Sequence, residues 1–193
     1  MIVAVTGSTR CGSTMMMRML AAGGLPVFAD NTVSLETALA LQLPMVTAWL
    51  RACEGKAVKL LEPLAFPPPS GYDYRFLLMS RDPLEQARSM RKFFNALHGE
   101  GTSIPSSAVA AIARSLRKDI PQMRHFLQSL GSVCDVRFEE VLRDPVQAAQ
   151  HVAAYLGDCC VLDAQAMAAV VVQRPPSCLP GFLELAALPG QTR

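Results

Sequence analysis

The first 22 residues constrain the fold of this chain more than any other segment. Residues 2–5 form a short apolar run that leads into a loop of Gly, Ser and Thr, residues 6–14, and then into a methionine-rich helical stretch. A strand, a glycine-containing loop and a helix in this order make an anion cradle. Glycine lets the backbone turn tightly, and the helix start supplies unpaired N–H donors and a positive dipole end. The segment predicts a phosphate or sulfate site, and the plainer alternative is a turn capped by Ser and Thr hydroxyls.

The loop departs from the P-loop pattern of nucleoside triphosphatases at the residue that contacts ATP most directly. Gly7 and Gly12 have the required four residues between them, but Ser13 and Thr14 follow where the pattern demands Lys and then Ser or Thr. The cation of the loop is instead Arg10. The lysine that would reach the β- and γ-phosphates is therefore absent, which argues against a small nucleotide or metabolite kinase without removing it as an alternative.

The composition is that of a folded domain. The 193 residues are 51% hydrophobic and 18% charged, and we expect one domain over residues 1–193 with an extended, proline-containing tail at residues 173–193. The net charge of +2 is too small to indicate a nucleic-acid surface, and no apolar stretch is long enough for a membrane span. The six cysteines form no Cys-x-x-Cys pair, so structural zinc is not expected. Without a signal peptide pattern, a cytoplasmic protein with reduced thiols is expected.

Strand-like apolar runs alternate with helical patterns along the chain. Strands are expected at residues 2–5, 57–61, 76–80 and 133–138. Helices are expected at residues 13–22, 34–52 with a possible interruption at Pro44, 83–97, 106–130 with a kink or break at Pro121, 145–157 and 163–172. The alternation predicts an α/β fold of three layers, in which helices flank a mostly parallel sheet of four to five strands.

Polar residues gather where the expected strands end. Lys59 and Glu62 lie at the end of the second strand, and Arg81 directly follows the third. Ligands of open parallel sheets bind beyond the carboxyl ends of the strands. Together with Arg10 of the loop, these residues predict a site for a ligand that carries more than one anionic group. Cys11 in such a cradle has the surroundings of a reactive thiol, although it also fits the loop simply as a small residue.

Three motifs, in order along the chain, resemble those of sulfotransferases that use 3′-phosphoadenosine 5′-phosphosulfate (PAPS). Residues 9–14 (Thr-Arg-Cys-Gly-Ser-Thr) stand in register with the family's loop for the 5′-phosphosulfate, although Thr9 replaces the usual Pro. Arg81, followed eight residues later by Ser89, is similar to the pair that binds the 3′-phosphate. Residues 137–140, 144–145 and 156–157 resemble the later motif. A late Gly-rich segment with Arg or Lys, common in the family, is not evident.

The resemblance implies a P-loop-like fold and transfer of a sulfuryl group from PAPS to a hydroxyl or amine, with 3′-phosphoadenosine 5′-phosphate (PAP) as product. The implied cofactor-binding residues are Arg10, Cys11, Gly12, Ser13, Thr14, Arg81 and Ser89. Such a transfer needs positioning, charge neutralisation and a base for the acceptor proton, and it needs no metal.

We expect Arg10 and Lys59 to act at the transferred group and Glu62 to be the base, with His98 as the alternative base. The acceptor, a small molecule or a glycan, and the oligomeric state stay open. So does a third possibility, a nucleotide-binding module without catalytic activity.

Overall fold

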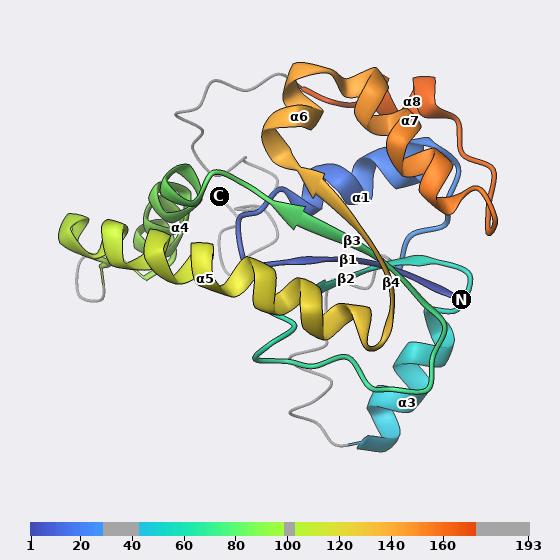
Figure 1. Cartoon of the computed structure of the whole chain (residues 1–193), viewed down its shortest axis with the longest axis horizontal. Helices are drawn as coiled ribbons and strands as arrows, with labels where there is room; N and C mark the ends of the chain where they lie inside the picture. Colours follow the sequence, from blue (N-terminus) through green and yellow to red (C-terminus); the bar gives the residue numbers. More distant parts are fainter. Residues whose placement is uncertain (29–42, 99–102, 173–193) are drawn as a thin grey trace, which may run out of the picture.

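The fold is organised around a four-stranded sheet whose strands are all parallel (Figure 1). The structure, a computed structural model, describes residues 1–28, 43–98 and 103–172. The strands are β1 (Ile2–Gly7), β2 (Ala57–Leu61), β3 (Tyr74–Ser80) and β4 (Gly131–Arg137), in the spatial order β2-β1-β3-β4. The predicted α/β fold, with helices flanking a parallel sheet of four to five strands, is confirmed.

Strand β1 occupies an inner position because it is apolar on both faces. All six of its residues are buried, and Val3 pairs with Ala57 of β2 on one side and with Arg75 of β3 on the other. Successive residues of a strand point to opposite faces, so Val3 and Val5 enter one core while Ile2 and Ala4 enter the other. A strand covered on both faces reads as a continuous apolar run, as this segment does.

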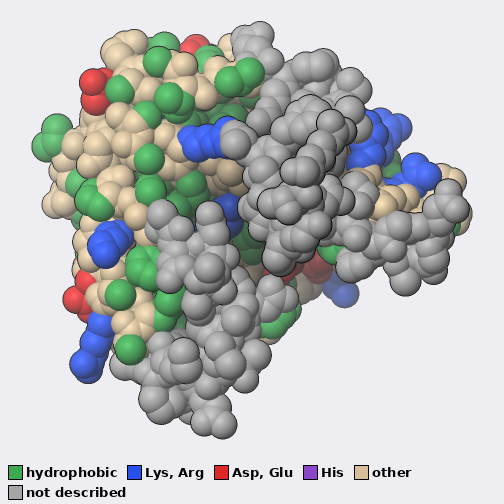
Figure 2. Space-filling model, turned by 180° about the vertical axis from the view of Figure 1, so that it is seen from behind, with side chains coloured by type: hydrophobic (Ala, Val, Ile, Leu, Met, Phe, Trp, Pro, Cys, Tyr) green, Lys and Arg blue, Asp and Glu red, His purple; other side chains and the backbone are tan. Residues whose placement is uncertain are grey.

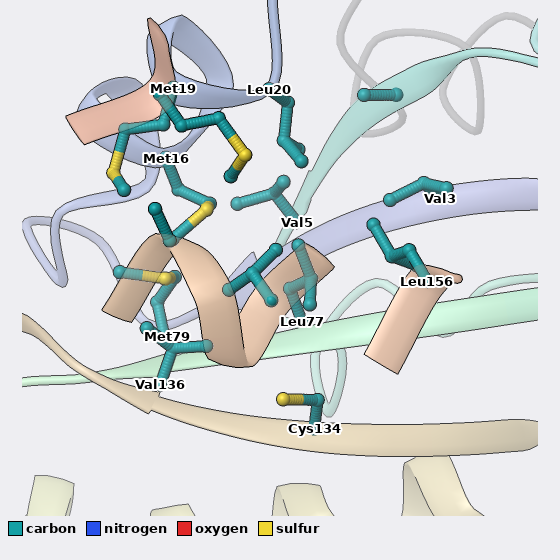
Figure 3. Packing of buried hydrophobic residues seen from close by; sticks show 14 of the residues in the cluster. Val3, Val5, Met16, Met19, Leu20, Leu77, Met79, Cys134, Val136 and Leu156 are labelled. Atoms are coloured by element: carbon teal, nitrogen blue, oxygen red, sulfur yellow. The ribbon is translucent and has the colours of Figure 1, made fainter. Parts of the chain in front are cut away.

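Helices cover both faces of the sheet. On one face lie α1 (Ser13–Ala22), α6 (Phe138–Arg143), α7 (Pro145–Leu156) and α8 (Ala164–Ala169), and on the other lie α3 (Leu43–Ala52) and α5 (Val109–Gln128) (Figure 1). A short 3-10 helix, η2 (Ser106–Ala108), precedes α5, and α4 (Pro83–His98) packs against α5 through Ala87, Ala113 and Leu116. Figure 3 shows the first core, where Met16 and Met19 of α1 meet Val5, Leu77 and Val136 of the sheet.

The structure corrects two expectations about individual elements. The break that was expected as one alternative at Pro121 is absent, because α5 runs as one element from Val109 to Gln128. Pro121 is exposed, and buried residues on both sides of it hold the helix in place, Leu116 against α4 and Met123 against the sheet. The fourth strand ends one residue early, and Phe138 opens α6, whose first turn carries two glutamates that favour a helix N-terminus.

Several other boundaries differ by a few residues, and some expectations lie outside the described residues. Strand β3 begins two residues before the expected start, and α8 is shorter than residues 163–172. Helix α3 is described from Leu43 onward, and the expected residues 34–42 lie outside the described residues, so the possible interruption at Pro44 stays a prediction. The expected tail at 173–193 is likewise outside. Of the helices in the described part of the chain, none is long and apolar enough to cross a bilayer.

Candidate active site

The carboxyl end of β1 is the topological switch point of the sheet. The chain goes from β1 to β2 on one side, and β3 then takes the place on the other side of β1. Open parallel sheets bind their ligands at such a point, outside the carboxyl ends of the strands. The loop of residues 8–12 follows β1 there, Glu62 follows β2, and Arg81 follows β3. The fold therefore brings these three segments to one edge, as the sequence predicted.

Two glycines give the loop its shape. Gly7 has φ 135° and Gly12 has φ 104°, both in the region that favours glycine. A Cβ at Gly7 would clash with the carbonyl oxygen of Met79, and a Cβ at Gly12 would lie 2.5 Å from the ring of Phe138. Gly12 is also the N-cap of α1, with no side-chain hydrogen bond to the first turn. The N-cap of this helix is therefore not a Ser or Thr hydroxyl, and a helix N-terminus of this kind favours an anion.

Arg10 joins the loop to α4. It has φ 70°, a left-handed conformation that is uncommon for a residue with a side chain. Its Nε donates to Ser89 Oγ at 3.2 Å, and its guanidinium lies 4.9 Å from the centre of the Phe93 ring. Ser89 is only 6% exposed. The two expected halves of the nucleotide site, 79 residues apart in the chain, thus touch through Arg10 and Ser89.

Glu62 lies at the loop, where it accepts a hydrogen bond. Its Oε1 accepts the N–H of Thr9 at 2.5 Å, and its own N–H donates to the carbonyl oxygen of Gly7 at 3.0 Å. Glu62 also has a left-handed backbone, with φ 53°, and its carbonyl oxygen accepts the N–H groups of Ala65 and Phe66. The sequence placed this carboxylate at the strand end, and its contact with the loop backbone was not expected.

Lys59 contributes a positive charge beside the helix start. Its Nζ donates to Thr14 Oγ1 at 3.0 Å, and the side chain is half-buried. Lys59 shares a strand face with Ala57, which packs in the same core as α1. The ammonium therefore lies at the first turn of α1, next to the backbone that the loop presents.

The guanidinium of Arg81 stacks on the ring of Phe138, and one of its N–H donors makes no hydrogen bond within the described residues. Its guanidinium carbon lies 4.7 Å from the centre of the Phe138 ring, and its Nε is buried without a hydrogen-bond partner. The following residue, Asp82, caps α4 by accepting the N–H groups of Leu84 and Glu85, both at 3.0 Å, and its own N–H donates to Glu139 Oε1 at 2.8 Å. In the described structure Ser89 bonds to Arg10, and no bond between Ser89 and Arg81 is seen.

Cys11 belongs to the core beneath the loop. Its side chain has no exposed surface and packs in the same cluster as Met16 and Met79. Burial raises the pKa of the Cys11 thiol to about 11. A reactive thiolate is therefore not formed here at neutral pH, and the simpler expectation, a small residue that fits the loop, is the better one. Any contact of Cys11 with a ligand would come from its backbone.

Sequence reasoning missed Gln86, Phe93 and Phe138. Gln86 and Phe93 lie three residues before and four residues after Ser89, on the same stripe of α4, so the helical repeat around Ser89 was a signal that could have found them. Phe138 was hidden because it was expected to end a strand. The alternative base, His98, ends α4, and residues 99–102 of the expected lid lie outside the described residues.

Charge at the site is local. On the face of the molecule opposite to that of Figure 1, the visible Lys and Arg side chains are dispersed among apolar ones (Figure 2). Within the described ranges, no group of three or more His, Cys, Asp and Glu side chains could hold a metal ion. Arg10 of the loop, Lys59 of β2 and Arg81 after β3 are the cations that the sequence predicted at this edge of the sheet.

The fold has counterparts among solved structures. No protein-family model and no curated protein matches this chain. The sulfotransferase domain from the curacin biosynthetic pathway superposes with a TM-score of 0.58 at 15% identity, over 95% of this chain and 85% of that domain. Mouse sulfotransferase SULT7A1, solved with PAP, superposes with a TM-score of 0.55 at 12% identity, over 99% of this chain and 68% of that one. The chain therefore has a sulfotransferase-like fold.

Proposed function

We propose that this protein is a sulfotransferase that moves a sulfuryl group from PAPS to a hydroxyl or amine acceptor and releases PAP. The observation that carries the proposal is the contact between Arg10 of the loop and Ser89 of α4 within a sulfotransferase-like fold. This contact joins an anion cradle to a second polar segment. A nucleotide with phosphates at both its 5′ and 3′ positions has the two separate anionic groups that such a site would bind. The mouse neighbour was solved with PAP, a ligand of this class.

The residues present fit such a nucleotide. Backbone N–H groups at the start of α1, from Gly12 to Thr14, would hold the 5′-phosphosulfate together with Arg10, since a helix N-terminus favours an anion. Arg81 and Ser89 would hold the 3′-phosphate. The buried Nε of Arg81 supports this role, because a buried donor without a partner is costly and a phosphate oxygen would satisfy it.

The proposed catalytic roles follow from the charge of each side chain and from its position beside the loop. PAPS supplies an activated sulfuryl group when it is bound. Arg10 and Lys59 would neutralise charge beside the loop, and Lys59 is already held at the first turn of α1 through Thr14. Glu62 would take the proton of the acceptor through Oε2, because Oε1 accepts the Thr9 N–H. The proposed acceptor is a small molecule or a glycan.

One observation favours a second candidate, a nucleotide-binding module without turnover. The Glu62 carboxylate is bonded to the Thr9 backbone, a contact that would serve the shape of the loop even if no proton were ever transferred. This candidate shares the nucleotide with the first and differs from it only in turnover.

Calorimetric titration with PAP, and with ATP plus Mg²⁺, tests the nucleotide class. We expect PAP to bind without magnesium and ATP to bind more weakly, because the loop lacks the P-loop lysine. Tighter binding of magnesium ATP would contradict the proposal and favour a kinase. Release of PAP from PAPS, measured with a panel of phenols, alcohols, amines and sugars, then tests turnover. Binding of PAP without release for any acceptor would favour the binding module.

A further inference from the structure

Gln86 is a polar side chain that the proposed chemistry does not use and that the structure nevertheless buries at the site. It lies in the second turn of α4 and is 2% exposed. Its side-chain amide nitrogen donates to two consecutive carbonyl oxygens of the loop, that of Ser8 at 3.2 Å and that of Thr9 at 2.9 Å. A buried amide with both N–H groups placed on one loop is a specific contact, since it satisfies both donors at once.

The two peptide groups of Thr9 are held from opposite sides. Glu62, which follows β2, accepts the N–H of Thr9, while Gln86 of α4 donates to the carbonyl oxygen of Thr9. Glu62 follows β2 and α4 follows β3, and these two strands lie on either side of β1 at the switch point. The N–H of Thr9 and the carbonyl oxygen of Ser8 belong to one peptide, which Glu62 holds at its N–H and Gln86 at its C=O. Gln86 also holds the carbonyl oxygen of the next peptide, so these contacts determine how the chain enters Arg10.

Arg10 is the residue whose backbone needs this support. Its φ of 70° costs free energy for a residue with a Cβ and persists only where the surroundings hold it. One stripe of α4 supplies that support, because Gln86 holds the backbone before Arg10 while Ser89 and Phe93 contact its side chain. Positions i, i+3 and i+7 of a helix lie on the same face, so all three reach the loop together.

We propose that Gln86 is a positioning residue that keeps the loop in the shape that binds the 5′-phosphate of the nucleotide. The proposal rests on the proposed function above. It assigns Gln86 no contact with the ligand, and it separates the two ends of the nucleotide. Loss of the Gln86 amide should weaken binding at the 5′-phosphate, which the loop would hold, and spare the 3′-phosphate, which Arg81 would hold.

Gln86→Met is the first test, because Met matches Gln in length and removes both donors. We expect PAP affinity to fall about tenfold, as for the loss of two neutral hydrogen bonds. Affinity for adenosine 3′-monophosphate, which lacks the 5′-phosphate, should change by no more than about twofold, because Arg81 stacks on Phe138 and shares none of the loop bonds that the variant loses. Gln122→Met, on an exposed turn of α5, is the matched control and should change neither affinity. Equal losses for the two nucleotides would overturn the proposal and mean a general effect on folding.

Gln86→Glu adds a readout that a purely structural role would not give. A carboxyl group facing two carbonyl oxygens can donate one hydrogen bond when protonated and repels them when ionised, and burial favours the protonated form. The ratio of its PAP affinity to that of the wild type should therefore rise as the pH falls from 8.5 to 5.5, while the ratio for Gln86→Met stays flat. A flat ratio for both variants would contradict the proposal.

Hydrogen exchange of the loop keeps the test decisive if the wild type fails to bind PAP. Peptides that cover residues 6–14 should exchange faster in Gln86→Met than in the wild type and in Gln122→Met, because the loop loses its two side-chain bonds. Faster exchange without PAP binding in the wild type would retain the positioning role and refute the proposed function. Unchanged exchange would refute the positioning role whatever the ligand.

Discussion

Glu62 offers the sharpest test of catalysis, because two substitutions separate its two roles. In Glu62→Gln the side chain keeps its length and an oxygen that can accept the Thr9 N–H, but it loses the ability to take a proton. In Glu62→Ala both the acceptor and the base are lost. If Glu62 is the base, Glu62→Gln should bind PAP nearly normally and lose turnover, and the acid limb of its pH–rate profile should disappear.

The expected magnitudes follow from the contact at Thr9. A hydrogen bond to a charged group contributes about 1.5–3 kcal/mol and one between neutral groups about 1 kcal/mol, so the Gln variant weakens the loop by about 1 kcal/mol. Removal of a negative charge beside an anion site acts in the opposite direction by about the same amount. PAP affinity should therefore change less than about fivefold in Glu62→Gln, while turnover falls about 10²–10⁴-fold, the usual contribution of acid–base catalysis.

Titration calorimetry with PAP and initial rates of PAP release from PAPS measure the two quantities. Glu62→Ala should lose PAP affinity as well, since the half-buried Thr9 N–H is left without its acceptor. Near-normal turnover in Glu62→Gln, together with inactive His98→Ala, would show that the base is His98 at the end of α4 and that the carboxylate serves only the loop. Equal loss of PAP binding in the Gln and Ala variants would refute the claim that the amide preserves the contact.

Three further predictions use matched variants. Arg81→Ala should weaken PAP about 30-fold, for the loss of a bond to a charged group of about 2 kcal/mol, and leave adenosine 5′-monophosphate unchanged in calorimetry; Arg88→Ala, an exposed partner of Glu85 on α4, should change neither. Gly12→Ala should lower the melting temperature and PAP affinity more than Gly24→Ala, since both have positive φ but only a Cβ at Gly12 meets an aromatic ring. Burial raises the pKa of the thiols of Cys11, Cys53 and Cys134 from 9.0 to about 11. The folded state then holds protons that the unfolded state releases, so full stability below pH 9 should fall by about 1.4 kcal/mol per thiol by pH 10. Denaturant unfolding across this range measures the fall, and a slope unchanged in Cys53→Ala would contradict it.

Local patterns in the sequence were sufficient to predict the layers of the fold and the sheet edge at which the proposed site lies. Apolar runs bounded by polar loops predicted the four strands, and their alternation with helices predicted that the sheet is parallel. Because parallel strands end at the same edge, the positions of Arg10, Lys59 and Arg81 after or near strand ends predicted that they gather there. The resemblance of Arg81 and Ser89 to the 3′-phosphate pair of sulfotransferases predicted the second segment of the proposed site.

Two residues depart from the preferences of their local sequence, because burial of neighbouring side chains outweighs those preferences. Pro121 is a helix breaker in isolation, yet α5 continues through it because the buried residues on both sides pack against the sheet and α4. Phe138 has high strand propensity, yet it opens a helix, where its ring packs against Gly12 and stacks with the guanidinium of Arg81. Propensity is a weak preference that tertiary packing can reverse, so neither outcome was readable from the segment alone.

By itself, the sequence determined what repeats along the chain: the strand and helix periods, the glycines of the loop and the residue types at the strand ends. Only the tertiary structure decided which side chains meet. The strand order β2-β1-β3-β4 places Glu62 and Gln86 on opposite sides of the Ser8–Thr9 peptide, and it brings Ser89 to Arg10. Such contacts join residues from 53 to 79 positions apart, and their geometry depends on sheet order and helix packing, for which no local pattern of residues carries a signal.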